Sequence, residues 1–315
     1  MGTIFITGAN GFIGRHLVNR LFKTGHKILG VGHGLWPEAD AHKAGMAHWI
    51  NGEIDSANLN QLKRVAGIPD YVIHLAGGSS VGAAISNPGE DFFRTVATSS
   101  NLLNWIRGEA SETQLLAISS AAIYGGGHKG LINEDVPPKP FSPYGVHKWL
   151  MEELCRSYAE NYGLRIAIAR LFSVYGNGLK KQLLWDSCAR LASGLPALDL
   201  GGTGSERRDW TDVHDVCCAL ELLLPQAEAK MPIFNVGTGK GITVREIAIA
   251  LTQAYHPGIA TPITFSGQSR PGDPFSLVAD SSLLNKLGFT WSIDWQDGIT
   301  DYVMWFKQQG ATARQ

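Results

Sequence analysis

Tyr144 and Lys148 are the pair of residues whose types and spacing point most directly to chemistry. They lie four positions apart, so on a helix their side chains would share one face, about one turn apart. A lysine ammonium in that position favours the ionised form of the tyrosine, whose phenol has an ordinary pKa of about 10. Such a phenol exchanges protons near neutral pH, which is what carbonyl reduction requires.

A third hydroxyl group, that of Ser120, follows an apolar run at residues 114–119. Open parallel sheets bind their ligands at the carboxyl ends of the strands, so we expect Ser120 to hydrogen-bond the reacting oxygen beside Tyr144. A serine at a strand end is often only a turn residue, but its combination with Tyr144 and Lys148 favours a catalytic role. We therefore predict that Ser120, Tyr144 and Lys148 are the catalytic residues.

Three glycines, Gly8, Gly11 and Gly14, stand between an apolar run at residues 3–7 and an amphipathic segment at 13–24. This spacing allows a tight turn, close approach of the backbone to a pyrophosphate, and close packing of the following helix on the strand. A glycine-rich turn without a ligand is the alternative. The strand, turn and helix context favours a dinucleotide site.

The second apolar run ends in Val31-Gly32-His33-Gly34, where an NAD site usually carries an aspartate or glutamate that binds the adenosine ribose. Without a carboxylate in this segment to repel a 2′-phosphate, NADP(H) is at least as well favoured as NAD(H). His33 is either a donor to the cofactor or a plain loop residue. The residues predicted to contact the cofactor are Gly8, Gly11, Phe12, Ile13, Gly14, His33, Glu53, Ile54, Leu75, Ala76, Gly77, Tyr144, Lys148 and Leu171.

Basic residues in the second half of the chain are candidates for binding a diphosphate, because planar guanidinium groups suit phosphate oxygens. Arg208 and Arg270 lie in glycine-flanked loops and are the better candidates, whereas we interpret Lys180 and Arg207 as solvated surface. The residues predicted to contact the substrate are Ser79, Ser120, Ala121, Ser173, Lys181, Arg208 and Arg270.

The composition gives no sign of a nucleic-acid or membrane partner. The 315 residues include 27 basic and 28 acidic ones, for a net charge of −1. No basic leader precedes the first apolar run and no later run has membrane-spanning length, so we expect a cytoplasmic protein. The ten histidines form no ligand motif, and the four cysteines are interpreted as buried thiols in a reducing compartment. We therefore predict no metal.

Short apolar runs alternate with amphipathic segments through the first half of the chain. The candidate strands are residues 3–7, 27–32, 71–76, 114–119 and 165–171, and the candidate helices are 13–24, 58–65, 92–107 and 144–162. This alternation predicts an α/β protein with a Rossmann-type, doubly wound parallel sheet. We expect a dinucleotide-binding domain at residues 1–171 and, at 172–315, mostly a smaller C-terminal substrate-binding lobe with some segments returning to the first domain.

Together these residues resemble the extended short-chain dehydrogenase/reductase family, in its nucleotide-sugar epimerase, dehydratase and reductase branch. The matching segments cover nearly the whole chain: GANGFIG at 8–14, VIHLAG at 72–77, SSAAIYG at 119–125, SPYGVHK at 142–148, RLFSVYG at 170–176, RRDWTDVHDV at 207–216 and RPGDPFSLVAD at 270–280.

The resemblance implies roles for individual residues. Tyr144 would be the general acid/base, Lys148 would lower its pKa and bind the nicotinamide ribose, and Ser120 would orient the sugar oxygen. Arg208 and Arg270 would clamp the diphosphate of a nucleoside-diphosphate sugar. The resemblance also implies a homodimer built from the helices near 92–107 and 144–162.

Two departures from the family pattern bear on the reaction. Dehydratases of this branch carry an acidic residue where this chain has Ala121 after Ser120, so dehydration is disfavoured. Many members have asparagine where this chain has Ser173, so sugar recognition should differ in detail.

From these observations we predict NADPH-dependent reduction of a nucleoside-diphosphate 4-keto-deoxyhexose, in the biosynthesis of surface-polysaccharide sugars. His33 and Ser173 favour this reaction over the alternative, an NAD-dependent nucleotide-sugar 4-epimerase of the UDP-hexose type. A non-catalytic sensor that binds a dinucleotide is the minor alternative.

Overall fold

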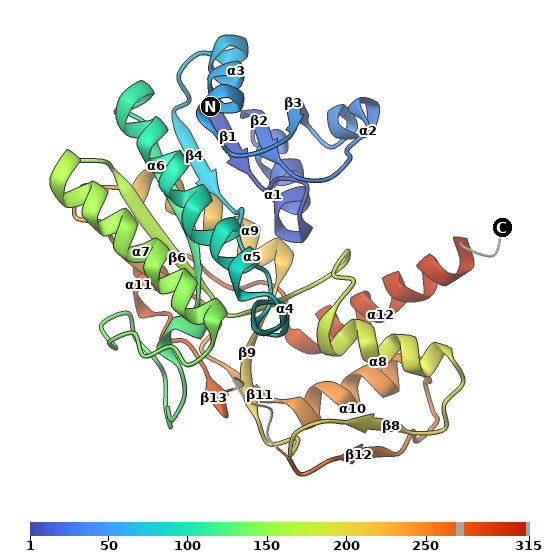
Figure 1. Ribbon diagram of the computed structural model, residues 1–315. Coiled ribbons are helices and arrows are strands. Elements are labelled where there is room, and N and C mark those ends of the chain that lie inside the picture. The colour runs from blue at the N-terminus through green and yellow to red at the C-terminus, as the bar shows by residue number, and fades with distance from the viewer. Residues whose placement is uncertain (269–273, 313–315) are drawn as a thin grey trace.

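Seven parallel strands form the central sheet of the computed structural model, which describes residues 1–268 and 274–312 (Figure 1). The strand order is β10-β6-β5-β4-β1-β2-β3. Their bounds are β1 Thr3–Thr7, β2 Lys27–Gly32, β3 Met46–Asn51, β4 Tyr71–His74, β5 Gln114–Ser120, β6 Ile166–Leu171 and β10 Ile233–Val236. The chain winds outward in both directions from β1, so the predicted Rossmann-type fold is confirmed.

Helices cover both faces of this sheet because apolar side chains line both faces of its strands. On one face the core includes buried residues of α1 and α9, and on the other face buried residues of α3, α6 and α7. Figure 1 shows α6 and α7 side by side on that second face. The bounds are α1 Phe12–Lys23, α2 Glu38–Lys43, α3 Ser56–Ala66, α4 Val81–Ser86, α5 Pro88–Phe92, α6 Thr98–Glu109, α7 Pro143–Tyr162, α9 Val213–Leu223 and α11 Ser282–Lys286.

The single helix predicted at residues 92–107 is interrupted. The chain forms α5, then a π-helical segment at Phe93–Ala97, and then α6. A π-helical turn inserts an extra residue without changing the apolar pattern much, so the sequence gives no warning of it. The strand predicted at 71–76 likewise ends at His74, and the next residues line a cavity described below.

A smaller lobe lies beyond one end of the sheet, with α8, α10 and α12 packed together around their own apolar core (Figure 1). Its helices are α8 Gln182–Ala192, α10 Val244–Tyr255 and α12 Trp295–Thr312. Its short strands are β7 Ser173–Tyr175, β8 Leu198–Leu200, β9 Arg207–Asp212, β11 Gly241–Thr243, β12 Ile263–Phe265 and β13 Ser276–Leu277. The lobe places polar loops opposite the carboxyl ends of the large sheet.

The second half of the chain also contributes to the large sheet, since β10 pairs in parallel with β6. Cys155, Cys188 and Cys217 are buried free thiols, whereas Cys218 is partly exposed. Across the residues that the structure describes, no helix combines the length and the apolar character needed to cross a membrane.

Candidate active site

One cavity of about 1590 Å³ runs from the glycine-rich turn, past Tyr144, to the lobe. It exceeds the ~300–1,000 Å³ typical of a site for one small molecule, so it has room for two ligands end to end. All the predicted cofactor residues line it, and so do all the predicted substrate residues that the structure describes. These are Gly8, Gly11, Phe12, Ile13, Gly14, His33, Glu53, Ile54, Leu75, Ala76, Gly77, Ser79, Ser120, Ala121, Tyr144, Lys148, Leu171, Ser173, Lys181 and Arg208. Arg270 lies outside the described residues.

The glycine-rich turn has the geometry of a pyrophosphate cradle. Gly8 has φ +73°, a conformation that side chains disfavour, and its amide donates to Val31 O at 2.9 Å. Gly11 caps α1 without a side-chain acceptor, and no acidic residue lies in the first turn of this helix. The amides at the positive end of the helix dipole are therefore available to an anion. The residues present fit a dinucleotide.

We expect Gly14→Ala to weaken binding of the dinucleotide. A Cβ atom at position 14 would lie 2.5 Å from Ala9 O, so the start of the helix must move away from the glycine-rich turn. The dissociation constant for NADH, measured by fluorescence titration, should rise at least about tenfold, or ~1.4 kcal/mol. Gly108→Ala is the matched control, because nothing lies within 4 Å of its Cβ position. Equal affinities in the two variants would contradict this account of the turn.

A carboxylate lies beside His33, although the segment at residues 31–34 contains no acidic residue. Glu53 Oε1 lies 3.4 Å from His33 Nε2, and both side chains are mostly exposed at the edge of the cavity. Residues 31–34 alone do not reveal this charge, because β3 pairs with β2 and the loop after β3 brings Glu53 to the same place. A negative charge there disfavours the 2′-phosphate of NADP(H).

The predicted catalytic hydroxyls of Ser120 and Tyr144 lie together because α7 packs closely on the turn after β5. A Cβ atom at Gly145 would lie only 2.6 Å from Ala122 O, so glycine is required at this contact. Ser142 caps α7, its Oγ accepting from the amide of Gly145 at 3.2 Å. The helix therefore begins with Tyr144 in its first turn, facing the end of β5.

The pKa of the Tyr144 phenol is raised above its ordinary value. Burial is the largest cause, a hydrogen bond with Ser120 opposes it, and the charge of Asp91 adds to it. The prediction of a lowered phenol pKa was wrong, because desolvation of the phenolate outweighs the favourable contacts. The phenol is thus held in its protonated form.

Lys148 is 5% exposed and its Nζ donates to Ile118 O at 2.9 Å, below the end of β5. Burial lowers the pKa of this ammonium to about 8, while the charges of Asp91 and Glu152 raise it. The ammonium is therefore present at neutral pH and is lost as the pH rises through about 8. It also lies near the backbone of Gly77, whose Cβ position is 3.1 Å from Nζ.

The lobe places cations on the far side of the cavity. Arg208 is partly buried, and its Nη1 donates to Arg207 O at 2.9 Å and to Phe275 O at 3.3 Å. Lys181 Nζ donates across the cavity to Ser79 O at 3.0 Å. Arg207 and Lys180 are exposed and do not line the cavity, as expected of surface residues.

The sequence model of the "NAD dependent epimerase/dehydratase family" matches residues 4–237, which is more than half of the 315 residues. The chain belongs to this epimerase/dehydratase family. The resemblance to extended short-chain dehydrogenases and reductases that act on nucleotide sugars is therefore confirmed.

Epimerases and reductases of this family are both among the proteins similar to the chain. The UDP-glucose 4-epimerase of Azospirillum brasilense is 30% identical over 315 residues, covering 94% of this chain and 89% of that protein. The GDP-6-deoxy-D-mannose reductase of Pseudomonas aeruginosa is 30% identical over 253 residues, covering 78% and 77%. The structure of Thermus thermophilus UDP-glucose 4-epimerase in complex with NAD superposes with a TM-score of 0.85 at 28% identity, covering 97% and 99%.

Several polar residues of this family member line the cavity without having been predicted. Gln182 begins α8 with φ +66°, a strained conformation for a residue with a side chain, and Arg190 and Asp199 follow it in the lobe. None of these three residues belongs to a motif that the sequence analysis recognised. Among the described residues, no group of three or more His, Cys, Asp and Glu side chains is arranged to hold a metal.

Proposed function

We propose that this protein is an NAD-dependent nucleotide-sugar 4-epimerase that acts on a UDP-hexose. The observation that carries the proposal is the continuous cavity, which joins the glycine-rich turn to the lobe cations and has the catalytic hydroxyls midway. A dinucleotide and a sugar nucleotide bound end to end would meet at Tyr144. This replaces the reductase that we inferred from the sequence.

Two observations support the epimerase over the reductase. The carboxylate of Glu53, 3.4 Å from His33, suits a ribose with free hydroxyls better than a 2′-phosphate, and so favours NAD(H). Similar family members include UDP-glucose 4-epimerases, one of them described in complex with NAD. An epimerase regenerates its NAD⁺ in each turnover, so it needs no supply of NADPH.

The chain's own residues would carry the proton chemistry. Tyr144 would accept the proton of the C4 hydroxyl while Ser120 holds the same oxygen by a hydrogen bond. When bound, NAD⁺ would supply the hydride acceptor, its reduced form the hydride donor for the return step, and its positive ring charge would favour the phenolate. After the keto sugar has turned, Tyr144 would return the proton to the C4 oxygen. Arg208 would hold the diphosphate throughout, so that the intermediate stays in the cavity.

The test of this proposal is the identity of the cofactor. We expect purified protein to release NAD in near-stoichiometric amounts on denaturation, identified by chromatography. We also expect it to interconvert UDP-glucose and UDP-galactose without added cofactor. Protein that requires added NADPH and consumes it would contradict the epimerase.

The reductase is the second candidate, on one observation. The GDP-6-deoxy-D-mannose reductase of Pseudomonas aeruginosa is as similar to the chain, at 30% identity, as the Azospirillum brasilense epimerase is. Consumption of NADPH with a UDP- or GDP-4-keto-6-deoxyhexose would establish it.

We expect Arg208→Ala to raise KM for the nucleotide sugar by about tenfold or more, because a charge-assisted hydrogen bond to phosphate is worth ~1.5–3 kcal/mol. KM for UDP-glucose is measured by coupled assay at saturating cofactor. Arg207→Ala, which removes an exposed guanidinium one residue away, should leave KM unchanged. Equal KM values in the two variants would remove Arg208 from the diphosphate site.

A further inference from the structure

A buried carboxylate that the proposed mechanism does not use lies next to the catalytic residues. Asp91 is the penultimate residue of the short helix α5 and is 5% exposed. Its Oδ2 lies 2.6 Å from Nδ1 of His147, whose side chain is 12% exposed. His147 stands between Tyr144 and Lys148 on α7, three residues after the first and directly before the second. Burying a carboxylate is unfavourable without such a partner, so the contact fixes α5 on α7.

The same carboxylate reaches the backbone that separates it from Lys148. A Cβ atom at Gly78 would lie 1.7 Å from Asp91 Oδ1, so a larger residue there would displace the carboxylate. The preceding residue, Gly77, has its Cβ position 3.1 Å from Lys148 Nζ. The two glycines therefore lie between the carboxylate and the ammonium, and both line the cavity. The amide of Gly78 is held in turn by Thr95 Oγ1 at 2.8 Å, from the π-helical segment that follows Asp91.

The ionisable groups that face Lys148 differ in how their charge is balanced. On α7, Glu152 is held in a two-pronged contact by Arg170, at 2.7 and 3.1 Å, so its charge is matched. Cys155 on α7 and His74 on β4 are neutral at pH 7, because burial raises the pKa of the thiol to about 12 and lowers that of the imidazole to about 3. Asp91, in contrast to Glu152, is hydrogen-bonded to the imidazole of His147, which carries a positive charge only when it is protonated.

We propose that Asp91, held by His147, is a positioning residue that supplies the counter-charge for Lys148 and acts on Tyr144 as a like charge to its phenolate. The inference rests on the proposed roles of those two residues. The negative charge stabilises the ammonium of Lys148 and opposes ionisation of Tyr144, so it raises the pKa of both. The contact with His147 holds the Asp91 carboxylate next to Gly78, which lines the cavity. It thereby fixes this part of the cavity wall to α7, the helix that carries the proton-transfer residues.

The test is the pH dependence of kcat/KM for UDP-glucose in Asp91→Asn, which keeps the size of the side chain and removes its charge. The two limbs together report a tyrosine that must accept a proton and an ammonium that must keep one. Both limbs should move to lower pH, by roughly one unit. A smaller neutral variant, Asp91→Ser, should shift them in the same direction, and Asp91→Glu, which keeps the charge, should restore them even where kcat falls.

Glu153→Gln is the matched control, since it removes an exposed carboxylate from the same helix α7 and should leave both limbs in place. If both limbs stay at the wild-type pH in Asp91→Asn and Asp91→Ser, the proposal is overturned, however much the rate falls. The contact between Asp91 and His147 would then be a packing contact only. That result is separable from failure of the proposed function, which would show as wild-type protein that does not interconvert UDP-glucose and UDP-galactose without added cofactor.

Discussion

Tyr144→Phe should lower kcat by about 10²–10⁴-fold, the range lost with a general acid/base, while the dissociation constant for NAD(H) stays close to wild type. The change removes one oxygen atom from a partly buried ring that packs in the first turn of α7. Its hydroxyl is the group that the mechanism requires to take and return the proton at C4. The measurement is kcat with UDP-glucose, together with a fluorescence titration of the cofactor.

Tyr162→Phe controls for the loss of a phenol elsewhere on the same helix. Tyr162 ends α7, is 53% exposed and does not line the cavity, so this variant should keep the wild-type kcat. A wild-type kcat in Tyr144→Phe would contradict the proton-transfer assignment.

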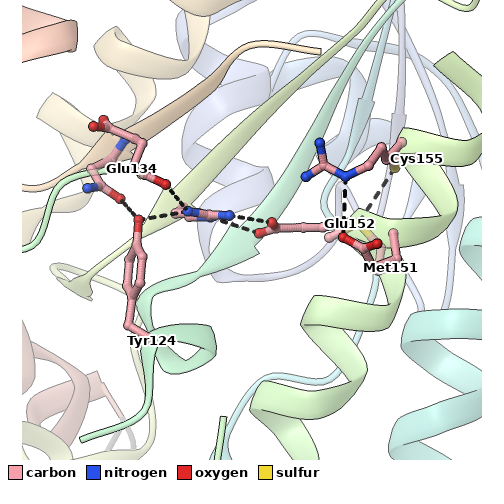
Figure 2. Close-up of polar contacts among 9 residues, drawn as sticks. Tyr124, Glu134, Met151, Glu152 and Cys155 are labelled. Atoms are coloured by element: carbon pink, nitrogen blue, oxygen red, sulfur yellow. Dashed lines mark hydrogen bonds and ion pairs between the residues drawn. The ribbon is translucent and has the colours of Figure 1, made fainter. Parts of the chain in front are cut away.

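Arg170→Met should destabilise the protein by about 3–5 kcal/mol, because it leaves a buried carboxylate without its partner. Arg170 and Glu152 are 2% and 1% exposed, and the guanidinium also contacts Tyr124 Oη at 2.9 Å and Glu134 O at 3.1 Å. Figure 2 shows this network, with the labelled Tyr124, Glu134 and Glu152 converging on one guanidinium group. The free energy of unfolding is measured by urea denaturation.

Arg156→Met is the control for that loss of stability. Arg156 pairs with Glu153 at 3.3 Å on the same helix, but both side chains are more than 40% exposed, so its loss should cost ~0–1 kcal/mol. The double variant Arg170→Met/Glu152→Leu should be more stable than Arg170→Met alone, because no buried charge is left unpaired. Equal losses in Arg170→Met and Arg156→Met would show that the buried network adds no stability.

The buried network also bears on the site. Glu152 lies one turn after Lys148 on α7, and Arg170 comes from β6 of the large sheet. Tyr124 Oη donates to Asn235 Oδ1 at 2.7 Å, which extends the contacts to β10. The helix that carries the proton-transfer residues is therefore fixed to two strands of the sheet.

Much of the fold could be predicted from local patterns. The apolar runs at residues 3–7 and 27–32 become β1 and β2 with the same bounds, because strands buried on both faces are continuously apolar. The glycine-rich turn and the Tyr144 and Lys148 pair were recognisable because short-range spacing alone defines them. The domain boundary after residue 171, the homodimer and the contacts of individual residues with ligands stay predictions.

The remaining features depend on contacts between segments distant in sequence. His33 meets Glu53 only because β3 pairs with β2, and Asp91 meets His147 across 56 positions because α5 packs on α7. The raised pKa of Tyr144 follows from burial, which no spacing of residues reveals. The polar residues of the lobe, such as Gln182, come from short elements without a clear period.

The most direct test of the central claim follows a deuterium atom placed at C4 of UDP-glucose. An enzyme that removes hydride from C4 and returns it to the other face should form UDP-galactose without added cofactor, and should retain the deuterium at C4. Mass spectrometry and proton NMR of the product measure both. Loss of the deuterium from C4, or turnover only with added NADPH, would contradict the proposed function.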